Sequence, residues 1–151
     1  MKILLKKYLS ADELQAVAAR IAEVERSTSG EIRVSIRRRR AWNERKLSLP
    51  DLSLSEFHRL GMHNTKERTG VLILLLISER KFHIMADEGI HRKVEEGTWD
   101  RIAASMSTQF KEGHFGRGLC DAVETVGAEL RKHFPRSTDD TNELPNDVVE
   151  R

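Results

Sequence analysis

Apolar residues recur at helical spacing in several segments of the chain. In the first segment, the apolar positions three or four residues apart are Leu14, Val17, Ala18, Ile21 and Val24. Ser10 and Glu13 precede this stripe at the spacing of a capping box, which predicts that a helix begins just after Ser10. The same periodicity predicts helices over 98–111 and 115–134, and a shorter helix over roughly 52–60.

Two other patterns predict strands. Residues 31–37 alternate between polar and apolar side chains, which is typical of a half-buried strand. Residues 70–77 are almost continuously apolar, as expected for a strand that is covered on both faces. The tight connection SERK leads into a third strand at 82–86, so the last two strands are predicted to form an antiparallel hairpin.

These elements follow one another in the order α-β-α-β-β-α-α, and two strands joined through a helix are expected to run parallel. The prediction is therefore an α/β fold, a three-layer α/β/α sandwich with helices flanking a small mixed β-sheet. That sheet consists of a βαβ unit plus an antiparallel hairpin strand. We expect one domain over 1–135, because 151 residues suit a single hydrophobic core. Residues 136–151 are polar and are predicted to be a disordered tail.

Composition narrows the functional classes. Charged residues make up 33% of the chain, but the net charge is only +2, so overall charge requires neither a nucleic-acid nor a membrane partner. The single cysteine, Cys120, excludes an internal disulfide. The apolar run at 3–5 is too short for a secretory signal, and the longest run, at 71–77, is too short for a membrane span. We therefore expect a soluble, cytoplasmic protein, most simply a monomer.

Polar residues are predicted to converge at one edge of the sheet. Glu31 starts the first strand, Gly70 starts the second, and Asp87 follows the third, which runs in the opposite direction. These three positions therefore share an edge, which the loop at 63–70 also enters. The polar side chains brought to this edge are Glu31, Asn64, Thr65, Asp87 and Glu88.

These side chains have the chemistry of a hard-cation site. Ca²⁺ and Mg²⁺ prefer carboxylate, amide and hydroxyl oxygens, together with backbone carbonyls and water. The structural alternative is that Asp87 only caps a short helix, whose N-terminus Glu88 favours electrostatically. In order of expected importance, the candidate ligands are Asp87, Glu31, then Asn64 or Thr65, and finally Glu88 and Asp100.

A run of four arginines, Arg37 to Arg40, indicates a different candidate function. With Trp42 nearby, the run has the composition of a weak nucleic-acid-binding loop. Such runs are more often solvated loops, so nucleic acid is the less favoured partner. The six histidines show no H-E-x-x-H spacing and pair with no cysteine motif, which argues against zinc.

Three stretches together resemble the TPM domain: TSGEIRVSI, GMHNTKERTGVLILLLISERKFHIMADEGI and FKEGHFGRGLCDAV. The resemblance extends over about residues 9–135 and points to the short, soluble bacterial subgroup. It implies an α/β/α sandwich with an acidic crevice, binding of Ca²⁺ or another divalent ion and, in some members, acid-phosphatase activity. The chain departs from the commoner K-D-N-G-V-L pattern of the family, because Arg68 and Thr69 precede Gly70.

We therefore expect a small TPM-like domain that binds a divalent cation, Ca²⁺ or Mg²⁺, at the edge that holds Glu31 and Asp87. It is expected to act as a binding or regulatory module for a protein partner. The alternative is a metal-dependent phosphatase in which Lys66 or Arg68 contacts the phosphoryl group. The sequence contains no D-x-D-x-T, C-x5-R or R-H-G element, which favours the binding module.

Overall fold

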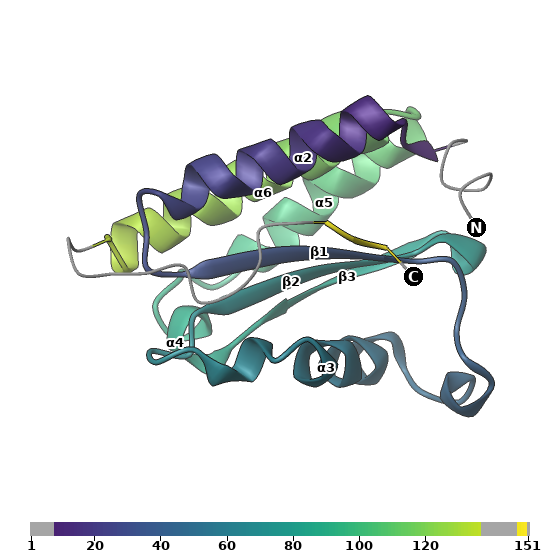
Figure 1. The fold of residues 1–151 in the computed structure, drawn as a ribbon, viewed down its shortest axis with the longest axis horizontal. Helices are drawn as coiled ribbons and strands as arrows, with labels where there is room; N and C mark the ends of the chain where they lie inside the picture. The colour runs from purple at the N-terminus through teal and green to yellow at the C-terminus, as the bar shows by residue number, and fades with distance from the viewer. Residues whose placement is uncertain (1–7, 137–147, 151) are drawn as a thin grey trace.

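The computed structural model describes residues 8–136 and 148–150 (Figure 1). Its helices are α2 (Ala11–Glu25), α3 (Leu49–Arg59), the short α4 (Glu88–His91), α5 (Thr98–Lys111) and α6 (Phe115–His133). Its strands are β1 (Glu31–Arg37), β2 (Gly70–Leu76), β3 (Lys81–Ala86) and β4 (Val149–Glu150). Short 3₁₀ turns are η1 (Trp42–Glu44), η2 (Met62–Asn64) and η3 (Ile77–Glu79). None of the helices in this described part is long and apolar enough to cross a membrane.

α2 and α3 both begin at capping residues that can be read in the sequence. α2 begins at the predicted capping box, in which Glu13 N–H donates to Ser10 Oγ (3.0 Å) and Ser10 N–H donates to Glu13 Oε1 (3.0 Å). α3 begins earlier than predicted, because Ser48 Oγ accepts the N–H of Asp51 (3.1 Å) and caps the helix. Pro50 fits into the first turn of α3, where a backbone N–H has no intrahelical acceptor.

The sheet has four strands in the order β3-β2-β1-β4. β1 runs parallel to β2, with Glu31 opposite Gly70, and β2 runs antiparallel to β3, which confirms both predicted pairings. β2 lies between β1 and β3 and is buried along its whole length. Its continuous apolar sequence therefore marks a strand covered on both faces, as predicted.

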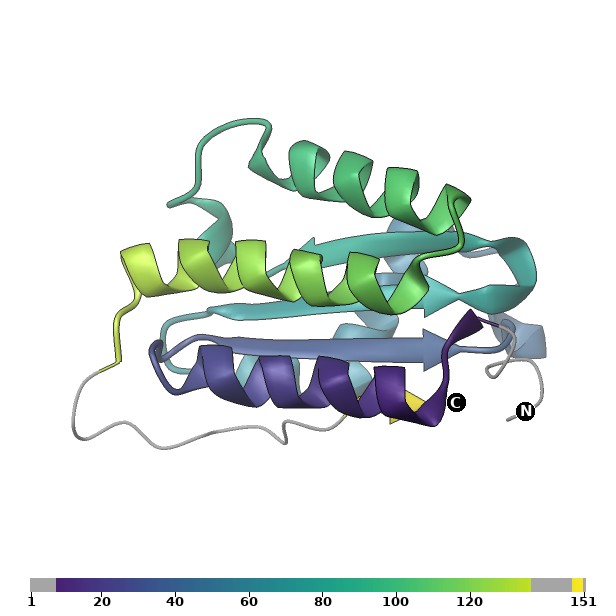
Figure 2. The same cartoon turned by 90° about the horizontal axis from the view of Figure 1, so that it is seen from above.

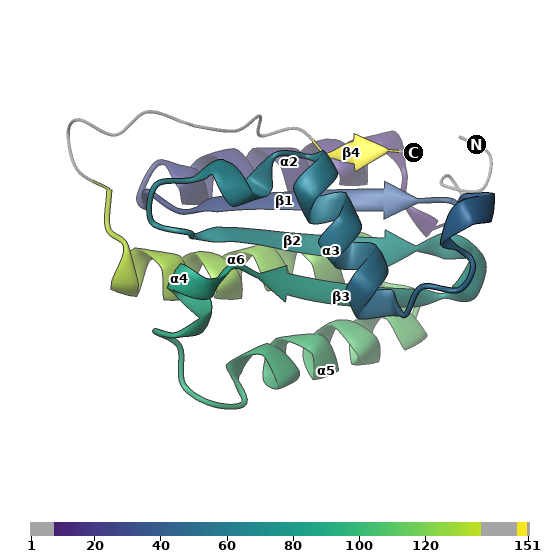
Figure 3. The same ribbon diagram turned by 90° about the horizontal axis from the view of Figure 1, so that it is seen from below.

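Helices cover both faces of the sheet, which makes the fold an α/β/α sandwich. α2, α5 and α6 lie over one face, as the view from above shows (Figure 2), and α3 lies over the other (Figure 3). The largest hydrophobic core lies beneath the three helices and includes Ile32, Val34 and Ile73 from the sheet. Two smaller apolar clusters, around Leu52 and Phe57, pack α3 against the opposite face.

The prediction for β1 is wrong in one respect, because its polar face is not exposed to solvent. The four polar side chains on this face are all buried: Glu31, Arg33, Ser35 and Arg37. α3 and the loop after β1 supply partners for two of them. Ser35 Oγ donates to Glu56 (2.6 Å), and the Arg37 guanidinium donates to both carboxylate oxygens of Glu44. Carboxylates supplied by distant segments thus satisfy polar residues that the alternation alone assigned to water.

β4 is a further difference from the sequence-based expectation. Val149 pairs with Ser35 and Glu150 pairs with Ile36, which adds a short parallel strand to the outer edge of β1. Both residues belong to the segment 136–151 that was expected to be a disordered tail. Residues 137–147 and 151 of that segment lie outside the described part of the chain.

Candidate functional site at the edge of the sheet

Asp87 is held by three contacts at the end of β3. Its backbone N–H donates to the carbonyl of Gly70 (2.8 Å), so it lies where β2 begins, as predicted. Its Oδ1 accepts the N–H of Glu88 (2.7 Å) and caps α4. Nε of Arg68 lies 3.2 Å from Oδ1 and 3.1 Å from Oδ2. The Asp87 carboxylate is therefore a helix cap, and an arginine neutralises its charge.

The loop that carries Arg68 is fixed by its own backbone. Arg68 has a left-handed φ of 59°, which is uncommon for a residue with a side chain. Its carbonyl accepts the N–H of Ile90 (3.3 Å), which ties the loop to α4. The buried Thr65 uses its hydroxyl oxygen to accept the N–H of Thr69 (3.1 Å). Thr65 is thus engaged in shaping the loop that positions Arg68.

Glu31, the other carboxylate expected at this edge, contacts a residue that was not among the candidate ligands. Its side chain is 2% exposed and is hydrogen-bonded to Glu25, the last residue of α2, which is 3% exposed. We call Glu25 and Glu31 the carboxyl pair. Burial is the main reason that the pKa of Glu25 is raised to about 9, and the hydrogen bond and charge of Glu31 add to it. Glu25 is therefore protonated near neutral pH.

Glu25 also completes the hydrogen bonding of β1. Glu31 N–H points towards β2, where it donates to Thr69 O (3.4 Å), so the next N–H along the strand faces the opposite edge. Among the described residues, β4 pairs with β1 at Ser35 and Ile36, away from that N–H. Glu25 Oε2 accepts it instead, at 2.9 Å from Ile32 N. This contact draws the end of α2 down onto the start of β1.

The segment after α6 lies against the same place. Arg136 donates from Nη1 to the Glu25 carbonyl (2.7 Å), and its backbone N–H donates to Ser27 O (3.3 Å). Thr28 Oγ1 donates to Phe134 O (2.5 Å) and accepts the N–H of Gly30 (3.0 Å). The positive charge of Arg136 partly counteracts the rise in the pKa of Glu25. The carboxyl pair is therefore enclosed by the end of α2, the start of β1 and residues 134–136.

The other predicted ligands lie apart from this pair. Glu88 and Asn64 are exposed, and Asp100 is exposed in the first turn of α5. Asp100 lines a separate cavity of about 370 Å³ together with His91, Glu95 and other residues. Within 8–136 and 148–150, no three His, Cys, Asp or Glu side chains are grouped so that they could hold a metal ion. Glu31 and Asp87 stand two strands apart, or about 10 Å between backbones.

The residues expected to contact phosphate are also separated. Lys66 is exposed in the loop before β2, whereas Arg68 directs its guanidinium to Asp87. An anion at this edge would have to compete with Asp87 for Arg68. These residues therefore do not form the phosphate site that the phosphatase alternative requires.

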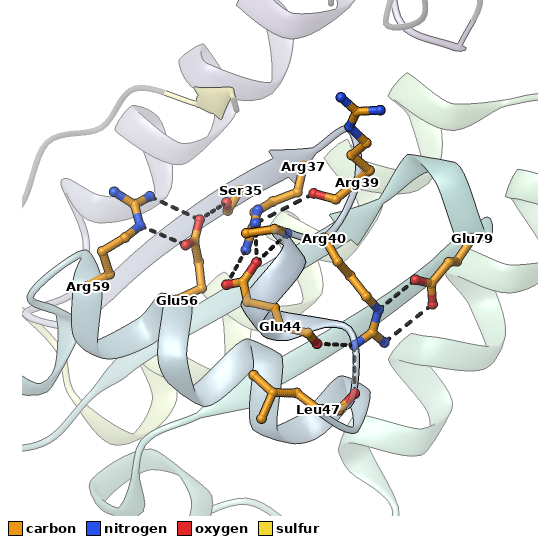
Figure 4. A network of polar contacts seen from close by, with 10 residues as sticks. Ser35, Arg37, Arg39, Arg40, Glu44, Leu47, Glu56, Arg59 and Glu79 are labelled. Carbon is orange, nitrogen blue, oxygen red and sulfur yellow. Dashed lines mark hydrogen bonds and ion pairs between the residues drawn. The ribbon is translucent and has the colours of Figure 1, made fainter.

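The arginine run that starts at the last residue of β1 is partly engaged within the protein, as Figure 4 shows. Arg37 pairs with Glu44, at 2.6 and 3.1 Å. Arg40 pairs with Glu79 and also donates to the carbonyls of Glu44 and Leu47. The hydrogen bond from Arg40 lowers the pKa of Glu79. Two of the four arginines thus hold the loop in place, which leaves Arg38 and Arg39 as the ones suited to an external anion.

Glu25 could have been recognised from the sequence. It lies four residues after Ile21, on the stripe of α2 that faces the core. A carboxylate on a buried helical stripe needs a partner, because an isolated buried charge is strongly unfavourable. What the sequence does not show is that the partner is Glu31, since the turn of residues 26–30 decides which groups meet.

Comparison with known proteins agrees with this architecture. The chain matches the TPM domain over residues 5–129. Among solved structures it is similar to the BA42 protein from the psychrophilic bacterium Bizionia argentinensis, with 36% identity and a TM-score of 0.85. That alignment covers 97% of this chain and 98% of BA42. A search of curated proteins gives no match.

Two more distant structures share the fold. The N-terminal domain of a protein from P. gingivalis is 22% identical, with a TM-score of 0.68 and coverage of 86% of this chain and 83% of that one. The N-terminal domain of the cg2496 protein from Corynebacterium glutamicum is 12% identical, with a TM-score of 0.62 and coverage of 89% and 81%. From the match along most of its length, we conclude that the chain belongs to the TPM domain family.

Proposed function

We propose that this TPM domain binds a divalent cation, most readily Ca²⁺, at the carboxyl pair, and that it acts as a binding module. The observation that carries the proposal is the contact between two almost fully buried carboxyl groups, Glu25 and Glu31. Two such groups cannot both be ionised side by side unless a positive charge lies between them. A proton supplies that charge in the metal-free protein, and a divalent cation could replace it.

The chemistry of the carboxyl pair suits a hard cation. Ca²⁺ takes oxygen ligands, and two carboxylates balance its charge. Further oxygens are available from backbone carbonyls in the turn at 26–30 and from water. The association of TPM domains with Ca²⁺ and other divalent ions supports the same choice. In this proposal Glu31 keeps its expected role as a ligand, and Glu25 takes the place first assigned to Asp87.

Asp87 is the weaker candidate because it already has a cationic partner. Arg68 contacts both of its oxygens, so a cation at Asp87 would have to displace a guanidinium. At the carboxyl pair, by comparison, Nη1 of Arg136 donates to the backbone carbonyl of Glu25.

The proposed module would couple the cation to the surface around it. The carboxyl pair joins α2 to β1, and Arg136 connects residues 134–136 to the same turn. Replacing a proton by a divalent cation would add one positive charge and draw backbone carbonyls of this turn towards the ion. We propose that a protein partner recognises the turn in that state.

Titration of the full-length protein with CaCl₂, followed by amide chemical shifts, tests the location. We expect the shifts to cluster at residues 25–32 and 134–136. The isosteric change Glu31→Gln should weaken binding more than about tenfold, because the number of charged ligands sets Ca²⁺ affinity. Asp87→Asn, the matched control, should change the affinity less than about threefold.

Two results would contradict this location. Shifts confined to residues 63–70 and 87–90, abolished by Asp87→Asn, would assign the cation to Asp87 instead. A gain in affinity in Arg68→Asn would do the same, because this change removes the competing guanidinium and places asparagine, which tolerates a left-handed φ, at position 68. No saturable shift anywhere would remove cation binding as the function.

The affinity for Ca²⁺ should increase with pH. Binding must displace the proton that the carboxyl pair holds, because the pKa of Glu25 is raised to about 9. Between about pH 6 and pH 8 the apparent association constant should therefore rise by up to about tenfold per pH unit. Calorimetry in buffers of different ionisation enthalpy measures the released proton directly. An affinity independent of pH over this range would show that the cation binds elsewhere.

A further inference from the structure

A second cavity lies at the opposite end of the sheet from the carboxyl pair. It has a volume of about 470 Å³ and lies where the β2–β3 connection approaches the junction of α5 and α6 (Figure 2). Leu75 and Ile77 line it from the sheet side, and Phe110 and Phe115 line it from the two helices. Its volume falls within the range of small-molecule sites in proteins. We call it the aromatic cavity.

Aromatic rings gather at this cavity. Phe82 contacts Phe110 (5.4 Å between ring centroids), Phe110 contacts Phe115 (5.2 Å), and Phe115 contacts Tyr8 (5.0 Å). Three of the five phenylalanines and the single tyrosine of the chain therefore form one continuous row. The three phenylalanines pack against the main hydrophobic core on one side, and all four aromatic residues remain partly exposed. The row offers an apolar surface that a ligand can cover.

The aromatic cavity is bordered by positive charge. Arg80, Lys81 and Lys111 line it and are all exposed. The side chains of Arg80 and Lys111 make no hydrogen bond or ion pair with any other residue in the described part of the chain. The nearby carboxylate of Glu79 is already paired with Arg40. Two cations at the mouth are thus available to a negatively charged group.

Arg80 occupies a position where its residue type is unusual. Its φ is 52°, in the left-handed region that favours glycine or asparagine. Arginine at this position gains nothing from local backbone geometry. What arginine provides here, and glycine or asparagine would not, is a charged side chain.

We propose that the aromatic cavity binds a small amphipathic carboxylate, an alkyl chain of about eight to ten carbons that ends in a carboxyl group. The alkyl chain would cover the row of rings, and the carboxylate would accept hydrogen bonds from Arg80 and Lys111. A neutral alkane would lack the negative charge, and a small polar anion would lack the apolar surface. An amphipathic carboxylate therefore fits the cavity better than either. The site is independent of the cation proposed above, because the two lie at opposite ends of β2.

Titration of the full-length protein with sodium octanoate, below its micellar concentration, tests the proposal. We expect saturable amide shifts at residues 75–82 and 107–115. Octan-1-ol has the same number of carbons without the charge and should bind about tenfold more weakly, because it lacks a charge-assisted hydrogen bond. Comparable binding of the alcohol and the carboxylate would overturn the proposal.

Variants then test the role of the arginine. Arg80→Asn removes the charge at a position that asparagine tolerates, so the fold should be retained and octanoate affinity should fall at least about fivefold. Arg26→Gln, an exposed site at the end of α2, lowers the net charge equally and should leave the affinity unchanged. Equal losses in both variants would indicate attraction by overall charge alone and would overturn the site. So would shifts that do not saturate or that lie outside the two named ranges.

Discussion

Replacing Glu25 by glutamine is expected to raise the free energy of unfolding near pH 8 by at least about 2 kcal/mol, measured with a chelator present. The pKa of this carboxyl group is raised from 4.5 to about 9 in the folded protein. Between these values the folded protein holds a proton that the unfolded chain releases. The stability of the wild-type protein therefore falls as pH rises, by up to about 1.4 kcal/mol per pH unit.

Glutamine removes this dependence without removing the contacts. Its carbonyl oxygen can accept the N–H of Ile32, and its amide can donate to Glu31. Urea unfolding at about pH 5, 7 and 9 should show a steep decline for the wild type and a nearly flat profile for Glu25→Gln. The control Glu23→Gln, on the exposed side of α2, should keep the wild-type slope. A wild-type profile that is flat, or that rises with pH, would contradict the shared proton.

The same substitution separates stability from cation binding. Glu25→Gln should stabilise the metal-free protein and weaken Ca²⁺ binding, because it removes both the buried titration and a charged ligand. Loss of a structural contact alone would lower both the free energy of unfolding and the affinity for Ca²⁺. Opposite signs in the two measurements are therefore specific to the carboxyl pair.

Substituting Gly89 by alanine is expected to lower the free energy of unfolding by about 3 kcal/mol. A Cβ atom at this position would overlap the backbone carbonyl oxygens of Glu67 and Arg68. Backbone cannot yield as a flexible side chain can, so the loop before β2 would have to move away from α4. The contacts between Arg68 and Asp87, and between Ile90 N–H and the Arg68 carbonyl, would be lost with that movement.

Gly113→Ala provides the control for this substitution. Gly113 has a φ of 83°, but a Cβ there would meet nothing within 4 Å. Its cost is limited to backbone strain, about 1 kcal/mol. Chemical denaturation should thus give a much lower free energy of unfolding for Gly89→Ala than for Gly113→Ala. Equal losses would mean that the loop before β2 can shift freely, and that the position of Arg68 over Asp87 is not fixed.

The structural features that depend on local sequence could be predicted. The apolar periods of α2, α5 and α6, the capping box at Ser10, and the continuous run of β2 depend only on neighbours in the chain. The parallel and antiparallel pairings followed from connection lengths. Even the position of Asp87 beside Gly70 could be deduced, since the hairpin reverses direction at a known point.

The candidate site was only partly predictable, for a different reason. Glu31 and Asp87 were correctly placed at one edge, but the groups that touch them come from segments whose approach the sequence does not specify. Arg68, expected to contact phosphate, instead neutralises Asp87. Glu25, to which the sequence assigned no role, is hydrogen-bonded to Glu31, and burial is the main reason that the pKa of Glu25 is raised to about 9.

The sequence by itself determined the main helices, the strands β1 to β3, their order and the family, because hydrophobic period, capping residues and turn length are properties of neighbouring residues. Only the tertiary structure decided which charges meet. Ser35 and Arg37 of β1 are buried against carboxylates of α3 and of the loop after β1, and the carboxyl pair forms because the turn at 26–30 folds the end of α2 onto β1. Buried polar groups must find partners wherever the fold supplies them, and these can be distant in the chain: Ser35 pairs with Glu56, 21 residues away, and Thr28 pairs with the carbonyl of Phe134, 106 residues away.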